Sequence, residues 1–302
     1  MTNYHIPVLY QHSIDALNID PNGIYVDVTF GGGGHSKGII DLLKNGRLIG
    51  FDRDADASEN GIEDERFTLV HHDYRWISNF LEFNTSVPVH GILADLGVSS
   101  HQFDTAERGF SFRQDTAIDM RMDNDIEQTA GDVLNSYSPA QLQSIFTIYG
   151  EIKNARTLAQ AVVTQRNSKK FETISDLIAV CELVMRKSDK RNKYLSQVFQ
   201  ALRIEVNQEL KSLEILLEAS AKLIKPGGRL VVITYHSLED RLVKNFIAKG
   251  KLHGPEEKDL YGNPIRPFDA VNRKPILPTE TEITENPRAR SAKLRIAVRR
   301  DE

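Results

Sequence analysis

Four consecutive glycines, Gly31 to Gly34, precede His35 and Ser36, between an apolar run and a helical pattern. Glycines let the backbone approach a ligand closely, and the start of a helix presents unpaired N–H groups to a carboxylate or phosphate. The motif is a poor dinucleotide fingerprint, because Ser36 stands where the third glycine would be. We therefore expect the loop to bind an anionic part of a cofactor, with a flexible turn as the alternative.

Three further side chains follow the ends of apolar runs. Asp52 lies nineteen residues after Gly33, where a carboxylate can accept hydrogen bonds from ribose hydroxyls, so an adenosine cofactor is favoured over an exposed acidic turn. Tyr74 either stacks on an adenine or packs in the core. Asp95 either accepts a hydrogen bond from a substrate amine or caps a helix.

His236 follows a later apolar run, and Ser237 is expected to be the N-cap of the next helix. The histidine either faces the same cleft as Asp95 or is a satisfied edge residue. The histidines show no metal-ligand spacing, and the single cysteine, Cys181, lies on an apolar helical stripe. Hydrolysis through a metal or a thiol is therefore disfavoured, and we expect no metal.

Short β-rich runs alternate with helical stretches over the first 100 residues, which is typical of a parallel sheet with crossover helices. The expected strands are residues 24–30, 47–52, 67–70, 89–95, 229–235 and 294–299. From about 129 to 202 apolar residues recur at helical spacing, with helix-start signals at Ser138-Pro139 and at Thr173 with Asp176. The sequence thus predicts an α/β sheet, residues 1–110 and 204–302, interrupted by an all-helical inserted domain, residues 111–203. An irregular, proline-rich loop is expected over residues 254–286.

The net charge of −4 conceals two basic clusters, either of which can meet phosphates or lie on a solvated surface. They are Arg288, Arg290, Lys293, Arg295, Arg299 and Arg300, and Arg186, Lys187, Lys190, Arg191 and Lys193. The first residues have no basic and apolar signal pattern, and no apolar run has membrane-spanning length. We expect a cytoplasmic protein with no membrane partner.

Taken together, seven segments in this order resemble the bacterial small-subunit (16S) ribosomal RNA cytosine-N4 methyltransferases, the RsmH/MraW family. They are His5-Ile6-Pro7-Val8-Leu9, the glycine loop through His35-Ser36, Asp52-Arg53-Asp54, Asp95-Leu96-Gly97-Val98-Ser99-Ser100, Glu107-Arg108-Gly109-Phe110-Ser111-Phe112, His236-Ser237-Leu238-Glu239-Asp240-Arg241 and Glu285-Asn286-Pro287-Arg288-Ala289-Arg290-Ser291. The similarity extends over almost the whole chain. Two positions depart from it: Gly32 stands where many relatives carry arginine, and Tyr74 stands where phenylalanine is expected.

The resemblance implies a class I S-adenosylmethionine-dependent methyltransferase (Rossmann-like) fold with S-adenosyl-L-methionine as cofactor. The cofactor contacts that it implies are Gly33, Gly34, His35, Asp52, Tyr74, Asp95 and Gln102. Asp95 is the expected acceptor for the amine, with Ser99, Ser100 and His236 as weaker catalytic candidates. RNA contacts are expected at Asn286, Arg288, Arg290 and Lys293.

The implied reaction methylates the exocyclic amine of a cytidine in the decoding centre of 16S ribosomal RNA, within the small ribosomal subunit, by a monomer or homodimer. We expect Asp95 to titrate near the ordinary aspartate pKa of about 3.9, and therefore to accept a hydrogen bond rather than act as a strong base. Two alternatives remain, a noncatalytic RNA-binding factor of ribosome assembly and a nicotinamide-dependent oxidoreductase. The oxidoreductase accounts for the glycine loop and Asp52, but not for the segment at His236 or the basic tail.

Overall fold

The computed structural model describes residues 7–301, apart from the side chain of Ser100. The chain forms two compact units, residues 1–97 with 210–302 and residues 98–209. The first unit is thus made of two stretches of chain that the second unit separates. The His5-Ile6 part of the first family segment and the side chain of the candidate Ser100 lie outside the described residues.

Seven strands of the first unit form one sheet in the order β3-β2-β1-β4-β5-β7-β6. They are β1 (Ile24–Asp27), β2 (Arg47–Asp52), β3 (Phe67–His71), β4 (Val89–Asp95), β5 (Ile224–Thr234), β6 (Phe268–Ala270) and β7 (Lys293–Arg299). The strands from β3 to β5 are parallel, and β7 runs antiparallel to both of its neighbours. The strand order reverses between β1 and β4, and the crevice at the carboxyl ends of such a pair is where open α/β sheets bind their ligands.

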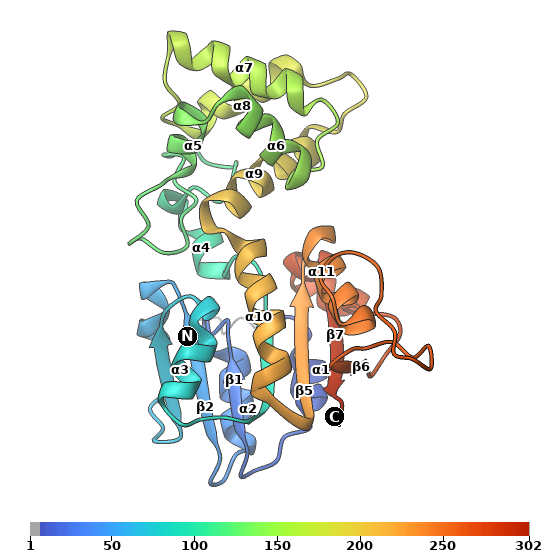
Figure 1. Ribbon diagram of the computed structural model, residues 1–302. Coiled ribbons are helices and arrows are strands. Elements are labelled where there is room, and N and C mark those ends of the chain that lie inside the picture. Colours follow the sequence, from blue (N-terminus) through green and yellow to red (C-terminus); the bar gives the residue numbers. More distant parts are fainter. Residues whose placement is uncertain (1–6, 302) are drawn as a thin grey trace. The chain divides into compact units, whose positions relative to one another are not determined.

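Alternation along the strands explains why helices cover both faces of the sheet (Figure 1). Val26 and Ile92 point into one core with α3 (Ile77–Phe83), α10 (Glu209–Leu223) and α11 (Ser237–Lys249). Their sequence neighbours point the other way: Tyr25, just before Val26, and Leu93, just after Ile92, pack on the opposite face with α1 (Tyr10–Leu17) and α2 (Gly34–Leu42). Because central strands such as β2 and β4 bury both of their faces, their sequences are almost continuously apolar.

The strands at 47–52 and 89–95 have the expected bounds, whereas others differ in extent. β1 ends at Asp27 rather than at residue 30, because the chain then turns into the glycine loop. β5 begins at Ile224, and its pairing with β4 shifts between Val89 and Gly91. The expected Lys225-to-Gly228 turn is therefore a bulge inside the strand, with Gly227 at φ 77°.

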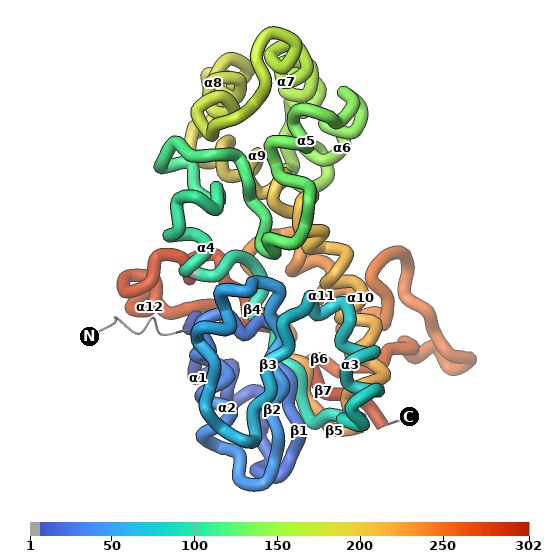
Figure 2. The backbone as a smooth tube through the Cα atoms, turned by 90° about the vertical axis from the view of Figure 1, so that its left-hand side faces the viewer, coloured from blue at the N-terminus to red at the C-terminus, as the bar shows by residue number. Residues whose placement is uncertain are grey.

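The expected irregular loop contains regular structure that has no sequence periodicity. β6 has three residues, and it is held by antiparallel pairing with β7. The short helices α12 (Glu280–Glu285) and η4 (Pro287–Ser291) follow. Before β6, the chain makes a hairpin-like excursion with Lys258 bridged to Pro264, and this excursion projects from the sheet unit (Figure 2).

The second unit is all helical, as the sequence predicts. Its helices are α4 (Ser100–Asp104), η3 (Ala106–Arg108), α5 (Ala130–Ser136), α6 (Pro139–Ile148), α7 (Ala155–Ser168), α8 (Ile174–Val184) and α9 (Arg191–Asn207). Ser138 and Thr173 begin α6 and α8 with capping boxes, and Cys181 is buried in the core. Within residues 7–301, no helix is long and apolar enough to span a bilayer.

This unit runs from residue 98 to residue 209, so it is longer than the expected 111–203. Phe110 belongs to its core, and the Arg108 guanidinium donates to the Met122 carbonyl at 2.9 Å. At the other end, the fully buried Asn207 accepts from the Met122 N–H at 2.7 Å and donates to the Met120 carbonyl at 2.7 Å. These contacts have no periodic sequence signal, which is why the boundaries differ.

Candidate active site

The glycine loop and Asp52 lie together at the carboxyl ends of β1 and β2. Gly33, at φ 73°, is the N-cap of α2, so the chain turns from the loop directly into the helix. Asp52 accepts hydrogen bonds from the N–H groups of Gly31, at 2.7 Å, and Asp54, at 2.8 Å. A carboxylate offers about four acceptor positions, so Asp52 can hold the loop and still accept hydrogen bonds from hydroxyls.

Two neighbouring glycines of the loop have different reasons to be glycine. A Cβ on Gly34 would lie 2.3 Å from Cγ of Pro7, so close packing excludes a side chain there. A Cβ on Gly32 would meet no atom within 4 Å. This open position explains how many relatives can carry arginine there, and it leaves the loop backbone accessible to a ligand.

His35, in the first turn of α2, is buried beside Asp95. Its Nδ1 lies 3.8 Å from Oδ2 of Asp95, and its ring stacks on Tyr10 with the ring centres 6.0 Å apart. Burial lowers the pKa of His35 to about 4, partly opposed by a hydrogen bond with the Val8 backbone, so the ring is neutral at pH 7. Its Nε2 is buried without a hydrogen-bond partner, which is the mark of a polar atom that a bound ligand can satisfy.

Asp95, at the end of β4, is fixed on two sides. Its N–H donates to Oγ1 of Thr29 at 2.6 Å, and its Oδ1 accepts from the Tyr235 hydroxyl at 2.8 Å. Burial raises the pKa of Asp95 to about 7; the Tyr235 hydrogen bond opposes this rise, while Asp27 and Glu239 add to it. The expectation of a pKa near 3.9 is therefore wrong, because the sequence does not show how far the sheet and its neighbouring acids disfavour the ionised form of this partly buried carboxyl.

Asp27 and Tyr235 are site residues that the sequence did not predict. Asp27 accepts from the Ser36 hydroxyl at 2.7 Å and from the Thr29 N–H at 3.1 Å, and burial raises its pKa to about 6. The signal was present, because Asp27 ends β1 and Tyr235 directly follows β5. The rule that selected Asp52 and Asp95 at strand ends applies to these two residues as well.

Tyr74 lies at the start of η2 (Tyr74–Trp76), just after β3. Only 7% of it is exposed, and it packs in the hydrophobic core under the sheet. The guanidinium carbon of Arg53 lies 6.0 Å from its ring centre, while Nη1 of Arg53 pairs with Asp73 at 3.4 Å. In this structure Tyr74 is thus a core residue whose ring is covered by the Arg53 guanidinium, and its stacking on adenine stays a prediction.

His236 is itself the N-cap of α11, so the expectation that Ser237 has this role is wrong. Nδ1 of His236 accepts from the Glu239 N–H at 3.5 Å, and Nε2 lies 3.1 Å from Oε1 of Glu239 without hydrogen-bond geometry. Glu239 in turn accepts from the Tyr235 and His236 N–H groups at 2.9 and 3.2 Å. The structure therefore gives the histidine a helix-capping role, and a catalytic role stays a prediction.

Ser99 and Gln102 belong to the second unit. The Ser99 hydroxyl accepts from the Gln102 N–H, and Oε1 of Gln102 accepts from the Ser99 N–H, both at 3.1 Å. This reciprocal pair is the capping box of α4. Both side chains thus have a structural role, and their roles in catalysis and cofactor binding stay predictions.

The basic residues of the tail differ in their surroundings. Arg288 and Arg290 are exposed on η4, and Oδ1 of Asn286 accepts from the Arg288 N–H at 3.2 Å. Lys293 pairs with Asp240 at 3.5 Å, and its neighbour on the same face of β7, Arg295, pairs with the same carboxylate at 2.7 Å. The surface of η4 is therefore better suited to phosphates than Lys293 is.

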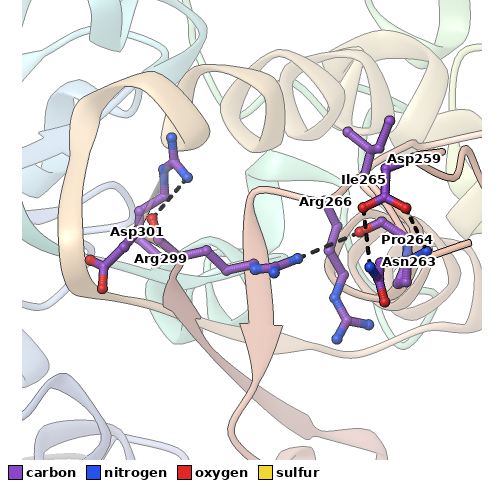
Figure 3. A pocket seen from close by; sticks show the side chains of 8 residues that line it. Asp259, Asn263, Pro264, Ile265, Arg266, Arg299 and Asp301 are labelled. Carbon is purple, nitrogen blue, oxygen red and sulfur yellow. Dashed lines mark hydrogen bonds between the residues drawn. The ribbon is translucent and has the colours of Figure 1, made fainter. Parts of the chain in front are cut away.

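A cavity of about 460 Å³ lies elsewhere in the first unit (Figure 3). It is lined by Asp259, Asn263, Pro264, Ile265, Arg266, Arg299, Arg300 and Asp301. Arg299 lines this cavity, and its neighbour Val298 pairs with Arg229, which starts the part of β5 that pairs with β7. The glycine loop and Asp95 instead follow the carboxyl ends of β1 and β4. The cavity therefore lies at the edge of the sheet opposite to the glycine loop and Asp95, and it is not part of their site.

A parallel sheet in this order, with an antiparallel strand inserted before the last, a glycine loop after β1 and an aspartate at the end of β2, defines a class I S-adenosylmethionine-dependent methyltransferase. Within that class the chain belongs to the MraW methylase family, whose family profile matches residues 2–300. It is 54% identical over 298 residues to "Ribosomal RNA small subunit methyltransferase H" of Cytophaga hutchinsonii, with 98% of this chain and 99% of that protein covered. The protein of the same name from Bacteroides fragilis is 53% identical over 297 residues, with 98% and 97% covered.

Proposed function

We propose that this protein transfers a methyl group from S-adenosylmethionine to the exocyclic N4 of a cytidine in the decoding centre of 16S ribosomal RNA. The observation that carries the proposal is the partly buried Asp95 carboxyl, held beside His35 where the strand order reverses. The name shared by the curated relatives supports ribosomal RNA of the small subunit as the substrate. We also propose that the reaction takes place in the cytoplasm.

The site residues fit the cofactor in three respects. The start of α2 and the open backbone at Gly32 suit its carboxylate, and the Asp52 carboxylate suits its ribose. The unpartnered Nε2 of His35 offers a further polar contact. When bound, the cofactor supplies an electrophilic methyl group and a positive charge, and a positive charge favours the ionised form of a nearby carboxyl such as Asp95.

The chemical difficulty lies in the amine, whose lone pair is delocalised into the cytosine ring. Asp95 at the amine N–H would favour a pyramidal nitrogen and then take the proton once the nitrogen is cationic. A carboxyl with a pKa of about 7 is better matched to this transfer at neutral pH than one with the ordinary value of 3.8. Fixing Asp95 from two sides also keeps the acceptor in place, which contributes through orientation.

RNA binding is proposed for the surface of η4, where Arg288 and Arg290 are exposed. The target cytidine has to leave its stack to reach the partly buried Asp95 carboxyl, and unpaired RNA lowers the cost of that movement. Whether the enzyme acts on assembled subunits or on free RNA can be decided directly. We propose the assembled small subunit as the better substrate.

The test is incorporation of radiolabelled methyl groups into small subunits and into free 16S RNA from cells that lack the modification, followed by nucleoside analysis. We expect N4-methylcytidine, and Asp95→Ala should nearly abolish it while changing the cofactor Kd only a few fold. A fully active variant would refute the role of Asp95. Loss of cofactor binding as well would make Asp95 a cofactor ligand first.

Membership of the MraW methylase family disfavours both alternatives, and each of them also gives a different result in the same experiments. An assembly factor without activity would bind small subunits but incorporate no methyl groups. A nicotinamide-dependent oxidoreductase would bind a nicotinamide dinucleotide rather than S-adenosylmethionine in titration calorimetry.

A further inference from the structure

Tyr235 joins the site from β5, the strand next to β4. Its ring is partly buried and packs against the hydrophobic core that includes Leu93 and Leu294, and its N–H donates to Oε2 of Glu239 at 2.9 Å. The hydroxyl donates to Oδ1 of Asp95 at 2.8 Å. The ring, the backbone and the hydroxyl are thus each fixed by a neighbour, which is the arrangement expected of a group that positions another.

The other ionisable groups around Asp95 do not share this arrangement. Asp27 of β1 and Glu239 of α11 are acids, and both disfavour the ionised form of Asp95 by repulsion. His35 of α2 is kept neutral by burial, and its Nδ1, 3.8 Å from Asp95, is beyond hydrogen-bond distance. Glu282 of α12 affects the pKa of Tyr235 by charge. Within residues 7–301, Tyr235 is the side chain that donates a hydrogen bond to the Asp95 carboxyl.

We propose that Tyr235 is a positioning residue for methyl transfer, whose hydroxyl orients the Asp95 carboxyl and sets the pH above which it is ionised. The inference rests on the proposed function. The phenol is suited to this role because burial raises its pKa well above 10, so it stays protonated and keeps donating throughout the working range. A donor to a carboxylate stabilises the ionised form, and its loss raises the pKa of the carboxyl.

The test compares Tyr235→Phe with the wild type in the pH dependence of kcat/KM for RNA. The acid limb of the variant should move to higher pH by about one unit, with activity reduced roughly tenfold at pH 6 and only a few fold at pH 9. The cofactor Kd of the variant should stay within a few fold of the wild-type value, because the hydroxyl that is removed is bonded to Asp95. An equal loss at every pH would overturn the proposal.

Tyr25→Phe is the matched control. Tyr25 is a buried tyrosine of the same unit, whereas Tyr235 is partly buried, and the Tyr25 hydroxyl accepts a hydrogen bond from the Asp20 N–H at 2.7 Å. Its loss should leave the pH profile in place. A shift as large as that of the Tyr235 variant would mean that any lost buried hydroxyl moves the profile, and it would refute a specific role for Tyr235.

Replacing Tyr235 site-specifically by 3-fluorotyrosine keeps the ring and makes the phenol a stronger donor, so the acid limb should move to lower pH. This variant still tests the proposal if Tyr235→Phe does not fold. Titration of Asp carboxyls labelled with carbon-13, with Asp95 assigned from Asp95→Asn, measures the same shifts without any activity. Absence of methyl transfer by the wild type would refute the proposed function, whereas an unmoved Asp95 titration in the variants would refute the role of Tyr235.

Discussion

Asp95→Asn should make the protein more stable at alkaline pH. Burial raises the pKa of Asp95 from 3.8 to about 7, so between these values the folded protein holds a proton that the unfolded chain releases. The folded state then binds more protons than the unfolded state, and the free energy of unfolding falls as pH rises. The shift of about 3 units lowers the free energy of unfolding of the wild type by about 4 kcal/mol at pH 8. The variant is spared this loss, because asparagine cannot ionise.

The measurement is urea unfolding of both proteins at pH 5 and pH 8. The single tryptophan, Trp76, lies in the same unit as Asp95, so its fluorescence reports the relevant transition. The advantage of the variant should be largest at pH 8 and shrink towards pH 5. Asp259→Asn is a control without pH dependence in this range. A hydrogen bond from the Asn263 backbone leads the causes that lower the pKa of Asp259 below 3.8, so its contribution is fully present at both pH values and its loss should cost the same at pH 5 and pH 8. A variant no more stable than the wild type at pH 8 would refute the reasoning.

Three further predictions concern packing and RNA binding. Asn207→Ala should lower the free energy of unfolding of the helical unit by about 3 kcal/mol in a urea titration, because two buried backbone groups lose their partner. Asn192→Ala, on the exposed face of α9, is the control and should have little effect. Gly34→Ala should lower the Tm and weaken cofactor binding at least tenfold in calorimetry, because the new Cβ would clash with Pro7. Gly32→Ala should leave the Tm unchanged, because no atom lies near its Cβ. Arg290→Glu should reduce kcat/KM for small subunits about tenfold at low salt and less at high salt, with an unchanged cofactor Kd, and an effect independent of salt would argue against a phosphate contact.

The sequence predicts those features that depend on neighbours along the chain. The strands at 47–52 and 89–95, the turn from the glycine loop into α2 and the caps at Ser138 and Thr173 all have local signals. Features that depend on pairing across the sheet were missed. β6 has only three residues and forms because β7 pairs with it. The cap of α11 is a different kind of error, because the His236 ring accepts locally from the Glu239 N–H, and the sequence favoured Ser237 only because serine is the commoner N-cap residue.

The raised pKa of Asp95 is the clearest case of a property that is not local. A strand-end aspartate is visible in the sequence, but its hydrogen-bond partners lie 66 and 140 residues away: Thr29, just before the glycine loop, and Tyr235, just after β5. Because the helical unit separates β4 from β5 in the sequence, no spacing rule brings Tyr235 to Asp95. The parallel pairing of the two strands does so.

The same pairing has an electrostatic consequence. With the pairing of β1 and β4, it brings Asp95 near Asp27 and Glu239, and each of these acids raises the pKa of Asp95 in addition to the effect of burial. Such a group of acids destabilises the free protein when they are ionised, and a positive charge among them relieves the repulsion. A cationic ligand therefore gains binding free energy by reducing the repulsion among these acids, and a neutral ligand gains less. The sulfonium of S-adenosylmethionine is cationic before methyl transfer, and the thioether that remains is neutral. If the proposed site is correct, we therefore expect these acids to favour binding of the cofactor over retention of its product.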